Sequence, residues 1–299
     1  MSLQQISREK AQIIRNADSQ FSEQMKRVED RLVKTIKQKL SQFEMANGKL
    51  STRSKTNTEL LARMQSITKR ALSESKYYDY VRNYLGNFDK IADLNQKAAQ
   101  IIVGQTIKPS TINAFKKIEI DRIAKNLVKP DGVQANIVDD IQRLLFKHVT
   151  TGISYEDASV EIVNLVQGLD GKQGLVERYS SQIARDSINR YNGTINNVLQ
   201  AEFELDGFRY VGSLIETSRQ ACEFLVEGTG PMEQFMRDGA YRIADLPEII
   251  EKLKNMSGWN PETTPTNFFE LRGGFNCRHE AIPIKLTKRQ LALWEDSEE

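Results

Sequence analysis

The fold class is decided by residues 14–43, IRNADSQFSEQMKRVEDRLVKTIKQKLSQF. Apolar side chains recur through this stretch at a mean spacing of about 3.6 residues, which is the period of an α-helix. Only Ile14, Phe21 and Val28 keep a strict seven-residue spacing, so a long coiled coil is not specified. The stretch therefore predicts a long amphipathic helix that needs a partner surface for its apolar face. The apolar positions are Ile14, Ala17, Phe21, Met25, Val28, Leu32, Ile36, Leu40 and Phe43.

Segments further along the chain also have the helical period. Residues 56–72 and 175–205 each place apolar side chains on one side, and Gly207 ends the second of these helices. Aromatic residues are dense from residue 77 to residue 88, which on its own suggests base stacking. Their spacing keeps them on one helix face, so we expect them to pack between helices. The residues on this face are Tyr77, Val81, Tyr84 and Phe88.

The hydrophobic period changes after Gly207. Two sets of residues alternate here, which suits a β-strand, and residues 281–284 form a second short candidate that could pair with it. The alternating sets are Phe208, Tyr210 and Gly212 against Arg209, Val211 and Ser213. The expected fold is therefore mainly α. A long helical region over residues 1–150 is followed by a small α+β module over residues 151–299, with a short antiparallel sheet.

Two local signals concern the end of one helix and the start of the next. His148 lies close to a helix end, where an isolated histidine is more typical of a C-terminal cap than of a ligand or a catalytic base. Ser154 and Asp157 have the spacing of a capping box and predict that a helix starts at Tyr155.

Length and composition indicate an ordinary folded protein. The chain has 299 residues, of which 39% are hydrophobic and 27% are charged, so it can bury a sizeable core. No apolar run approaches the ~18 residues that span a bilayer, and the N-terminus lacks the apolar core of a secretory signal. We expect no membrane partner and synthesis in a reducing cytoplasm, where thiols stay reduced or bind metal.

Charge is distributed unevenly along the chain. Residues 1–60 hold 12 Lys and Arg against 7 Asp and Glu, whereas residues 200–299 hold 11 against 18. Solvated helix faces commonly carry such charges. The alternative is that the basic N-terminal part approaches nucleic acid, by non-specific contact, or an acidic partner surface. No recognised DNA-binding motif accompanies the charge.

Both cysteines and one of the two histidines lie in two short segments, FRYVGSLIETSRQACEFL at 208–225 and RGGFNCRHEAIP at 272–283. Thiolate and imidazole are preferred zinc ligands, so Cys222, Cys277 and His279 form a candidate zinc site. A fourth ligand would come from water or from a nearby glutamate. Two alternatives stay open, which are a disulfide between the cysteines and two buried cysteines without a metal. The candidate glutamates are Glu216, Glu223 and Glu280.

A catalytic role has little support in the sequence. Cys277 and His279 are two residues apart, so in a strand they would share one side without facing each other. No Ser-His-Asp order, paired-carboxylate motif, HExxH motif or phosphate-binding loop accompanies them. We expect no enzymatic activity and no catalytic residues.

The order of these elements resembles the Mu F-like, or minor head protein, family of tailed bacteriophages. An arginine-bearing helix at 180–205 precedes the strand at 208–215, and Thr217-Ser218-Arg219 leads to Cys222. The box Asn276-Cys277-Arg278-His279 then closes the domain before a strand that contains proline. The resemblance covers roughly residues 150–290. Within it, we expect Phe208, Tyr210 and Phe275 to form the core, and Gly212, Gly273 and Gly274 to serve backbone geometry.

The resemblance implies a minor capsid protein of the phage head, bound at or near the portal vertex and acting in head morphogenesis, genome packaging or delivery. The portal protein is the implied partner, and the major capsid protein is a further one. The implied location is the virion, after assembly in the host cytoplasm. Two alternatives are an assembly factor absent from the finished particle and a protein related to toxins or ADP-ribosyltransferases that carry Mu F-like domains.

Overall fold

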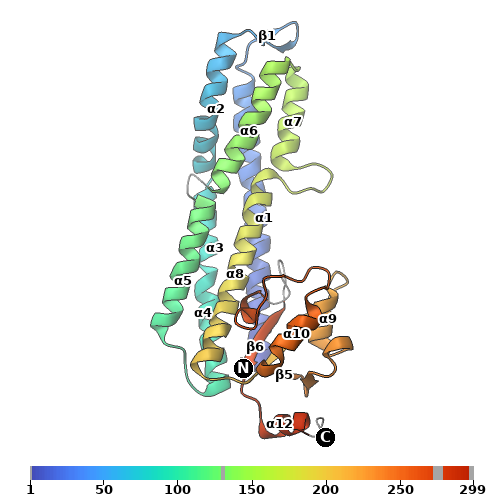
Figure 1. The fold of residues 1–299 in the computed structure, drawn as a ribbon. Helices are drawn as coiled ribbons and strands as arrows, with labels where there is room; N and C mark the ends of the chain where they lie inside the picture. The colour runs from blue at the N-terminus through green and yellow to red at the C-terminus, as the bar shows by residue number, and fades with distance from the viewer. Residues whose placement is uncertain (1, 129–131, 272–278, 296–299) are drawn as a thin grey trace. The chain divides into compact units, whose positions relative to one another are not determined.

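The computed structural model describes residues 2–128, 132–271 and 279–295. The described chain is mainly α, with two small antiparallel sheets, which confirms the expected fold class (Figure 1). It divides into two compact units, each built from separate segments. The sheet unit comprises Met1–Arg15, Asn87–Glu119 and Arg185–Glu299, and the helical unit comprises Asn16–Gly86 and Ile120–Ala184.

Two long helices explain why the units are discontinuous in sequence. Helix α1 (Leu3–Leu40) and helix α8 (Leu175–Glu202) each contribute one end to the sheet unit and the other end to the helical unit. The boundary predicted at residue 150 falls inside helix α6 (Val133–Thr151). The predicted halves 1–150 and 151–299 therefore divide the chain differently from the two compact units.

Helix α1 buries the face that its period predicts. The apolar positions from Ala17 to Leu40 in that pattern are all buried within the helical unit. The helix ends at Leu40, earlier than the pattern suggests, and a hairpin of β1 (Met45–Ala46) and β2 (Lys49–Leu50) follows. Asn47 and Gly48 form its turn with φ of 52° and 75°, the left-handed values that a tight hairpin turn requires.

The rest of the helical unit packs around α1. Tyr84 is buried and packs against Phe21 in a tilted arrangement, with ring centroids 5.0 Å apart. It donates a hydrogen bond to the carbonyl of Ala184 at 2.7 Å. Tyr77 donates to the carbonyl of Leu127 at 2.9 Å. These contacts confirm that the aromatic run packs between helices. The remaining elements of this unit are α2 (Lys55–Glu74), α3 (Tyr77–Leu85), a π-helical turn (Ala124–Val128), α6 and α7 (Tyr155–Gln167).

The sheet unit is organised around strand β3 (Gly207–Val211). It pairs antiparallel with β6 (Glu280–Ile284), with Tyr210 opposite Ala281, which confirms the predicted pairing. On its other side β3 pairs with β5 (Ala240–Arg242), and β5 pairs with β4 (Met236–Arg237), giving the strand order β4-β5-β3-β6. The other α-helices of this unit are α4 (Asn87–Val103), α5 (Pro109–Ile123), α9 (Gln220–Glu227), α10 (Leu246–Leu253), α11 (Phe268–Leu271) and α12 (Lys288–Glu295). Helix α5 belongs to this unit as far as Glu119, and its last turn belongs to the helical unit.

An aromatic core fills the space between this sheet and its helices. Phe208 is fully buried, stacks on Tyr241 at 5.0 Å and contacts the ring of Phe268 at 5.1 Å. Tyr210 is buried in the same cluster. Phe208 and Tyr210 therefore have the predicted core role, while Phe275 lies outside the described residues. No helix in the described ranges is long and apolar enough to cross a membrane.

Candidate functional site

Two of the three predicted metal ligands lie around Tyr210 in the sheet unit. Cys222, in the first turn of α9, is buried with its Sγ 3.6 Å from the Tyr210 hydroxyl. His279, directly before β6, is buried and stacks on the Tyr210 ring with centroids 5.7 Å apart. Cys277 lies outside the described residues. The fold thus brings residues 222 and 279 to the same tyrosine, which sequence reasoning had placed only in the core.

A glycine makes room for the histidine. A Cβ added at Gly212, just after β3, would overlap the imidazole of His279. The backbone at Gly212 also has φ of 156°, which L side chains rarely adopt. Gly212 therefore serves backbone geometry as predicted, whereas Gly273 and Gly274 lie outside the described ranges.

The described residues alone do not complete a metal site. Among them, no three His, Cys, Asp or Glu side chains are grouped so as to hold a metal ion. Cys222 and His279 supply a thiol and an imidazole, which are the ligand types that zinc prefers. The zinc site stays a prediction that requires Cys277.

Replacing Cys277 with serine tests that prediction. If the two cysteines and His279 bind zinc, the wild-type chain should hold about one zinc per chain, because three protein ligands suffice with water or a carboxylate as the fourth. Cys277→Ser should then lose the zinc and lower the melting temperature, since metal binding contributes to folding stability. Metal analysis and thermal melting of both proteins measure this. A zinc-free wild type, or an unchanged melting curve in Cys277→Ser, would count against the site.

A buried polar network adjoins this cluster. Lys10 of α1 and Glu280 of β6 are 1% and 6% exposed, and Lys10 Nζ lies 2.8 Å from Glu280 Oε1. Asn192 and Asn196 of α8 donate to the same Glu280 oxygen at 2.9 and 3.1 Å. Lys10 also donates to Asn95 Oδ1 at 2.7 Å. The network joins α1, α4, α8 and β6 through one buried charge pair.

The sequence also contains a signal for this network, which is a lysine among the apolar positions of the first helix. Lys10 lies four residues after the buried Ile6 and seven before the buried Ala17, so it occupies the apolar stripe of α1. A lysine on such a stripe needs a buried partner. Burial alone would raise the pKa of Glu280, but Lys10 and the two asparagine donors outweigh it, so its pKa is lowered. Glu280 is therefore held as the carboxylate.

A cavity of about 680 Å³ opens beside both groups, within the sheet unit. Its described walls come from the start of α1, from α8, from the end of β3 with the loop that follows, and from the first turns of α9. Cys222, Tyr210 and His279 are among its lining residues, and so are Lys10 and Glu280. A thiol, an imidazole and a charge pair thus share one solvent-accessible space.

The helical unit holds a second buried acidic group. Glu29 of α1 is 2% exposed and its Oε1 accepts a hydrogen bond from the backbone N–H of Glu177 at 2.8 Å, in the first turn of α8. Burial raises the pKa of Glu29 to about 7, although the backbone hydrogen bonds oppose this. A Cβ at Gly174 would overlap the Glu29 carboxyl group. Gly174 therefore allows this side chain to reach the helix terminus.

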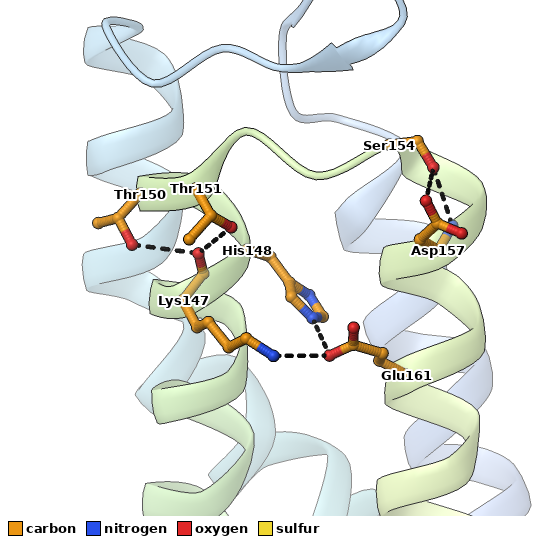
Figure 2. A network of polar contacts seen from close by, with 7 residues as sticks. All are labelled: Lys147, His148, Thr150, Thr151, Ser154, Asp157 and Glu161. Carbon is orange, nitrogen blue, oxygen red and sulfur yellow. Dashed lines mark hydrogen bonds and ion pairs between the residues drawn. The ribbon is translucent and has the colours of Figure 1, made fainter.

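His148 connects two helices of the helical unit and does not cap one. It is fully buried inside α6, which continues to Thr151, and its Nε2 lies 3.0 Å from Glu161 Oε2 on α7 (Figure 2). The expected capping role of this side chain is therefore wrong, because the helix extends beyond it and turns it towards α7. Hydrogen bonding by His148 lowers the pKa of Glu161.

The predicted start of α7 is confirmed in the same region. Ser154 Oγ accepts from the backbone N–H of Asp157 at 3.1 Å and donates to Asp157 Oδ2 at 2.7 Å (Figure 2). The first of these bonds is the N-cap contact that the spacing predicts, while the carboxylate of Asp157 contacts the hydroxyl of Ser154. It fixes the first turn of the helix that carries Glu161.

Comparison of the chain with protein-family models, with curated proteins and with solved structures gave no match. What the candidate site can do follows from its chemistry. The thiol of Cys222 and the imidazole of His279 suit a soft metal ion. The cationic side chains on the cavity wall suit an anion.

Proposed function

We propose that the chain is a minor head protein of a tailed bacteriophage, bound at or near the portal vertex and acting in head morphogenesis, genome packaging or delivery. The observation that carries the proposal is the order of the Mu F-like elements. Helix α8, strand β3, the helix of Cys222 and the His279–β6 segment follow one another in the order of the resemblance, and all of them except the first part of α8 belong to the sheet unit. A non-enzymatic role in assembly is part of the proposal.

Exposed apolar residues in the helical unit support a role in binding other proteins. Phe146 of α6 is 58% exposed, and Tyr155 and Val160 of α7 are 37% and 53% exposed. Tyr155 and Val160 line one hollow together with Lys37 of α1. Neighbouring exposed apolar side chains, such as Tyr155 and Val160 in this hollow, are typical of protein interaction surfaces. We propose that this surface contacts the portal protein or the major capsid protein.

The basic start of the chain supports proximity to DNA. The excess of Lys and Arg over residues 1–60 favours non-specific contact with phosphates. In the finished particle, such contact would be with the packaged genome. The proposed location is therefore the virion head near the portal vertex, reached from the host cytoplasm during assembly.

Quantitative peptide mass spectrometry of purified, DNA-filled particles tests the proposal, with the major capsid protein as the internal standard. A portal-associated protein should be present in a few to about a dozen copies per particle, because the portal vertex is unique and symmetric. Empty procapsids analysed in parallel show when the protein enters the particle. Absence from filled particles but presence in procapsids would indicate an assembly factor, and absence from both would overturn the head-protein function.

A further inference from the structure

The cavity of the sheet unit has an unusual balance of charge. Its described lining residues contribute five Lys or Arg side chains and a single carboxylate, that of Glu280. Chain regions of the sheet unit beyond residue 200 are acidic overall, so this concentration of cations is local. The cationic lining residues are Arg8, Lys10, Arg15, Arg209 and Arg219.

The only described carboxylate of the lining is already paired. Glu280 Oε1 forms an ion pair with Lys10 Nζ at 2.8 Å and accepts hydrogen bonds from two asparagines. Beyond Glu280, the described lining residues hold no carboxylate that could offset the charge of Arg8, Arg15 and Arg209. An anion entering this space would meet guanidinium groups and a charge pair that is already neutralised.

The arginines come from separate elements that the fold brings to one opening. Arg8 and Arg15 lie seven residues apart on α1, and therefore on the same side of that helix. Arg209 occupies the exposed position of β3 between the buried Phe208 and Tyr210. Arg8, Arg15 and Arg209 are all solvent-exposed side chains at the rim. Such a group can reach an anion without breaking the core.

Hydroxyl groups complete the lining. The loop after β3 contributes Ser213, Thr217 and Ser218, and Ser7 of α1 adds another. Guanidinium and hydroxyl groups are the donors that most often bind phosphate oxygens. The volume of about 680 Å³ lies within the range of small-molecule sites and exceeds the needs of a simple inorganic ion.

We propose that this cavity binds a phosphate group, supplied either by the backbone of DNA or by a free phosphorylated small molecule. The arginines at the rim would hold its oxygens, and the loop hydroxyls would donate to those that remain. The site is built from the sheet unit alone, so it would exist whether or not the chain is a component of the phage head.

The full-length chain tests this with two probes and two variants. Pyrophosphate titrated by calorimetry represents the free ligand, and a short fluorescein-labelled DNA duplex followed by anisotropy represents the backbone. Arg8→Ser/Arg209→Ser removes two rim arginines. The matched control, Arg63→Ser/Arg289→Ser, removes the same charge from exposed positions on α2 and α12, outside the cavity lining. Melting temperatures confirm that both variants are folded.

Arg8→Ser/Arg209→Ser should weaken at least one probe about tenfold or more, because each arginine provides charge-assisted hydrogen bonds. The control should stay close to the wild type. Weakened pyrophosphate binding alone identifies a free ligand. Weakened DNA binding, with a shallower salt dependence, identifies the DNA backbone. Failure of the wild type to bind either probe, or equal weakening in both variants, would overturn the proposal.

Discussion

Replacing Lys10 with methionine should lower the free energy of unfolding by about 3–5 kcal/mol, because it leaves a buried carboxylate without its counter-charge. Lys10 is the only charged donor that the described contacts give to Glu280, and both side chains are almost completely buried. Methionine keeps the length and apolar stem of lysine, so the change removes the charge with little loss of packing. Urea unfolding at pH 7 measures the difference.

Two further variants separate the charge effect from packing. Lys10→Met/Glu280→Gln removes both charges, and the glutamine oxygen can still accept from Asn192 and Asn196. We expect it to recover most of the loss, since replacing both members of a buried pair is far less costly than removing one. Lys26→Met, at an exposed position of the same helix, should change stability by less than about 0.5 kcal/mol. A Lys10→Met variant as stable as Lys26→Met would contradict the interpretation.

Local periodicity predicted the elements that bury one side and expose the other. The apolar residues of α1 are buried at the expected positions because the helical period places them all on the same side of the helix. The pairing of β3 with β6 was also predicted, since the alternation after Gly207 and the short apolar run at 281–284 indicate two strands that can pair.

The β4–β5 hairpin was missed although a signal for it is present. The two strands have two and three residues, which is too short for a period to be recognised. Their turn is Asp238-Gly239, and both residues have left-handed φ, 48° and 69°. Asp-Gly between short runs is a strong hairpin signal. For strands this short, the Asp-Gly pair is therefore a better signal of the turn than any hydrophobic pattern.

The candidate site was predicted only in part, because local sequence patterns identify neighbouring residues but not contacts between distant segments. Segment composition drew attention to Cys222 and His279, which do meet at Tyr210. The Lys10–Glu280 pair spans 270 residues of sequence, so no local pattern could join its members. A buried network of this kind becomes visible only when the fold brings both ends of the chain to the same place.

Two of the buried glutamates, Glu280 and Glu29, should depend on pH in opposite directions. The lowered pKa of Glu280 means that its contribution to stability is present above the ordinary carboxyl range and is lost as the pH falls through its folded pKa. The raised pKa of Glu29 means that stability is lost as the pH rises from the ordinary carboxyl value towards the folded pKa. Burial raises the pKa of both carboxyl groups, but Lys10 and two asparagine donors outweigh it at Glu280. At Glu29, backbone hydrogen bonds oppose the effect of burial only in part, and the carboxyl group of Glu177 adds to it.

Replacing Glu29 with glutamine should therefore remove a loss of stability that the wild type shows as the pH rises. Between the ordinary value of 4.5 and about 7, the folded chain keeps a proton on Glu29 that the unfolded chain releases. Raising the pH through this window favours unfolding, by about 3 kcal/mol for a shift of this size. Glutamine stays neutral and can still accept a hydrogen bond from the Glu177 N–H.

Urea unfolding of both proteins from pH 4.5 to 7.5 measures this effect. The difference between the two free energies of unfolding isolates Glu29, because the contributions of the other titrating groups are the same in both proteins. Glu9→Gln, at an exposed position of α1, should follow the wild type. If the stability of Glu29→Gln changed with pH in the same way as that of the wild type, the prediction would be wrong. The Glu29 carboxyl group would then be ionised in the folded chain throughout this range.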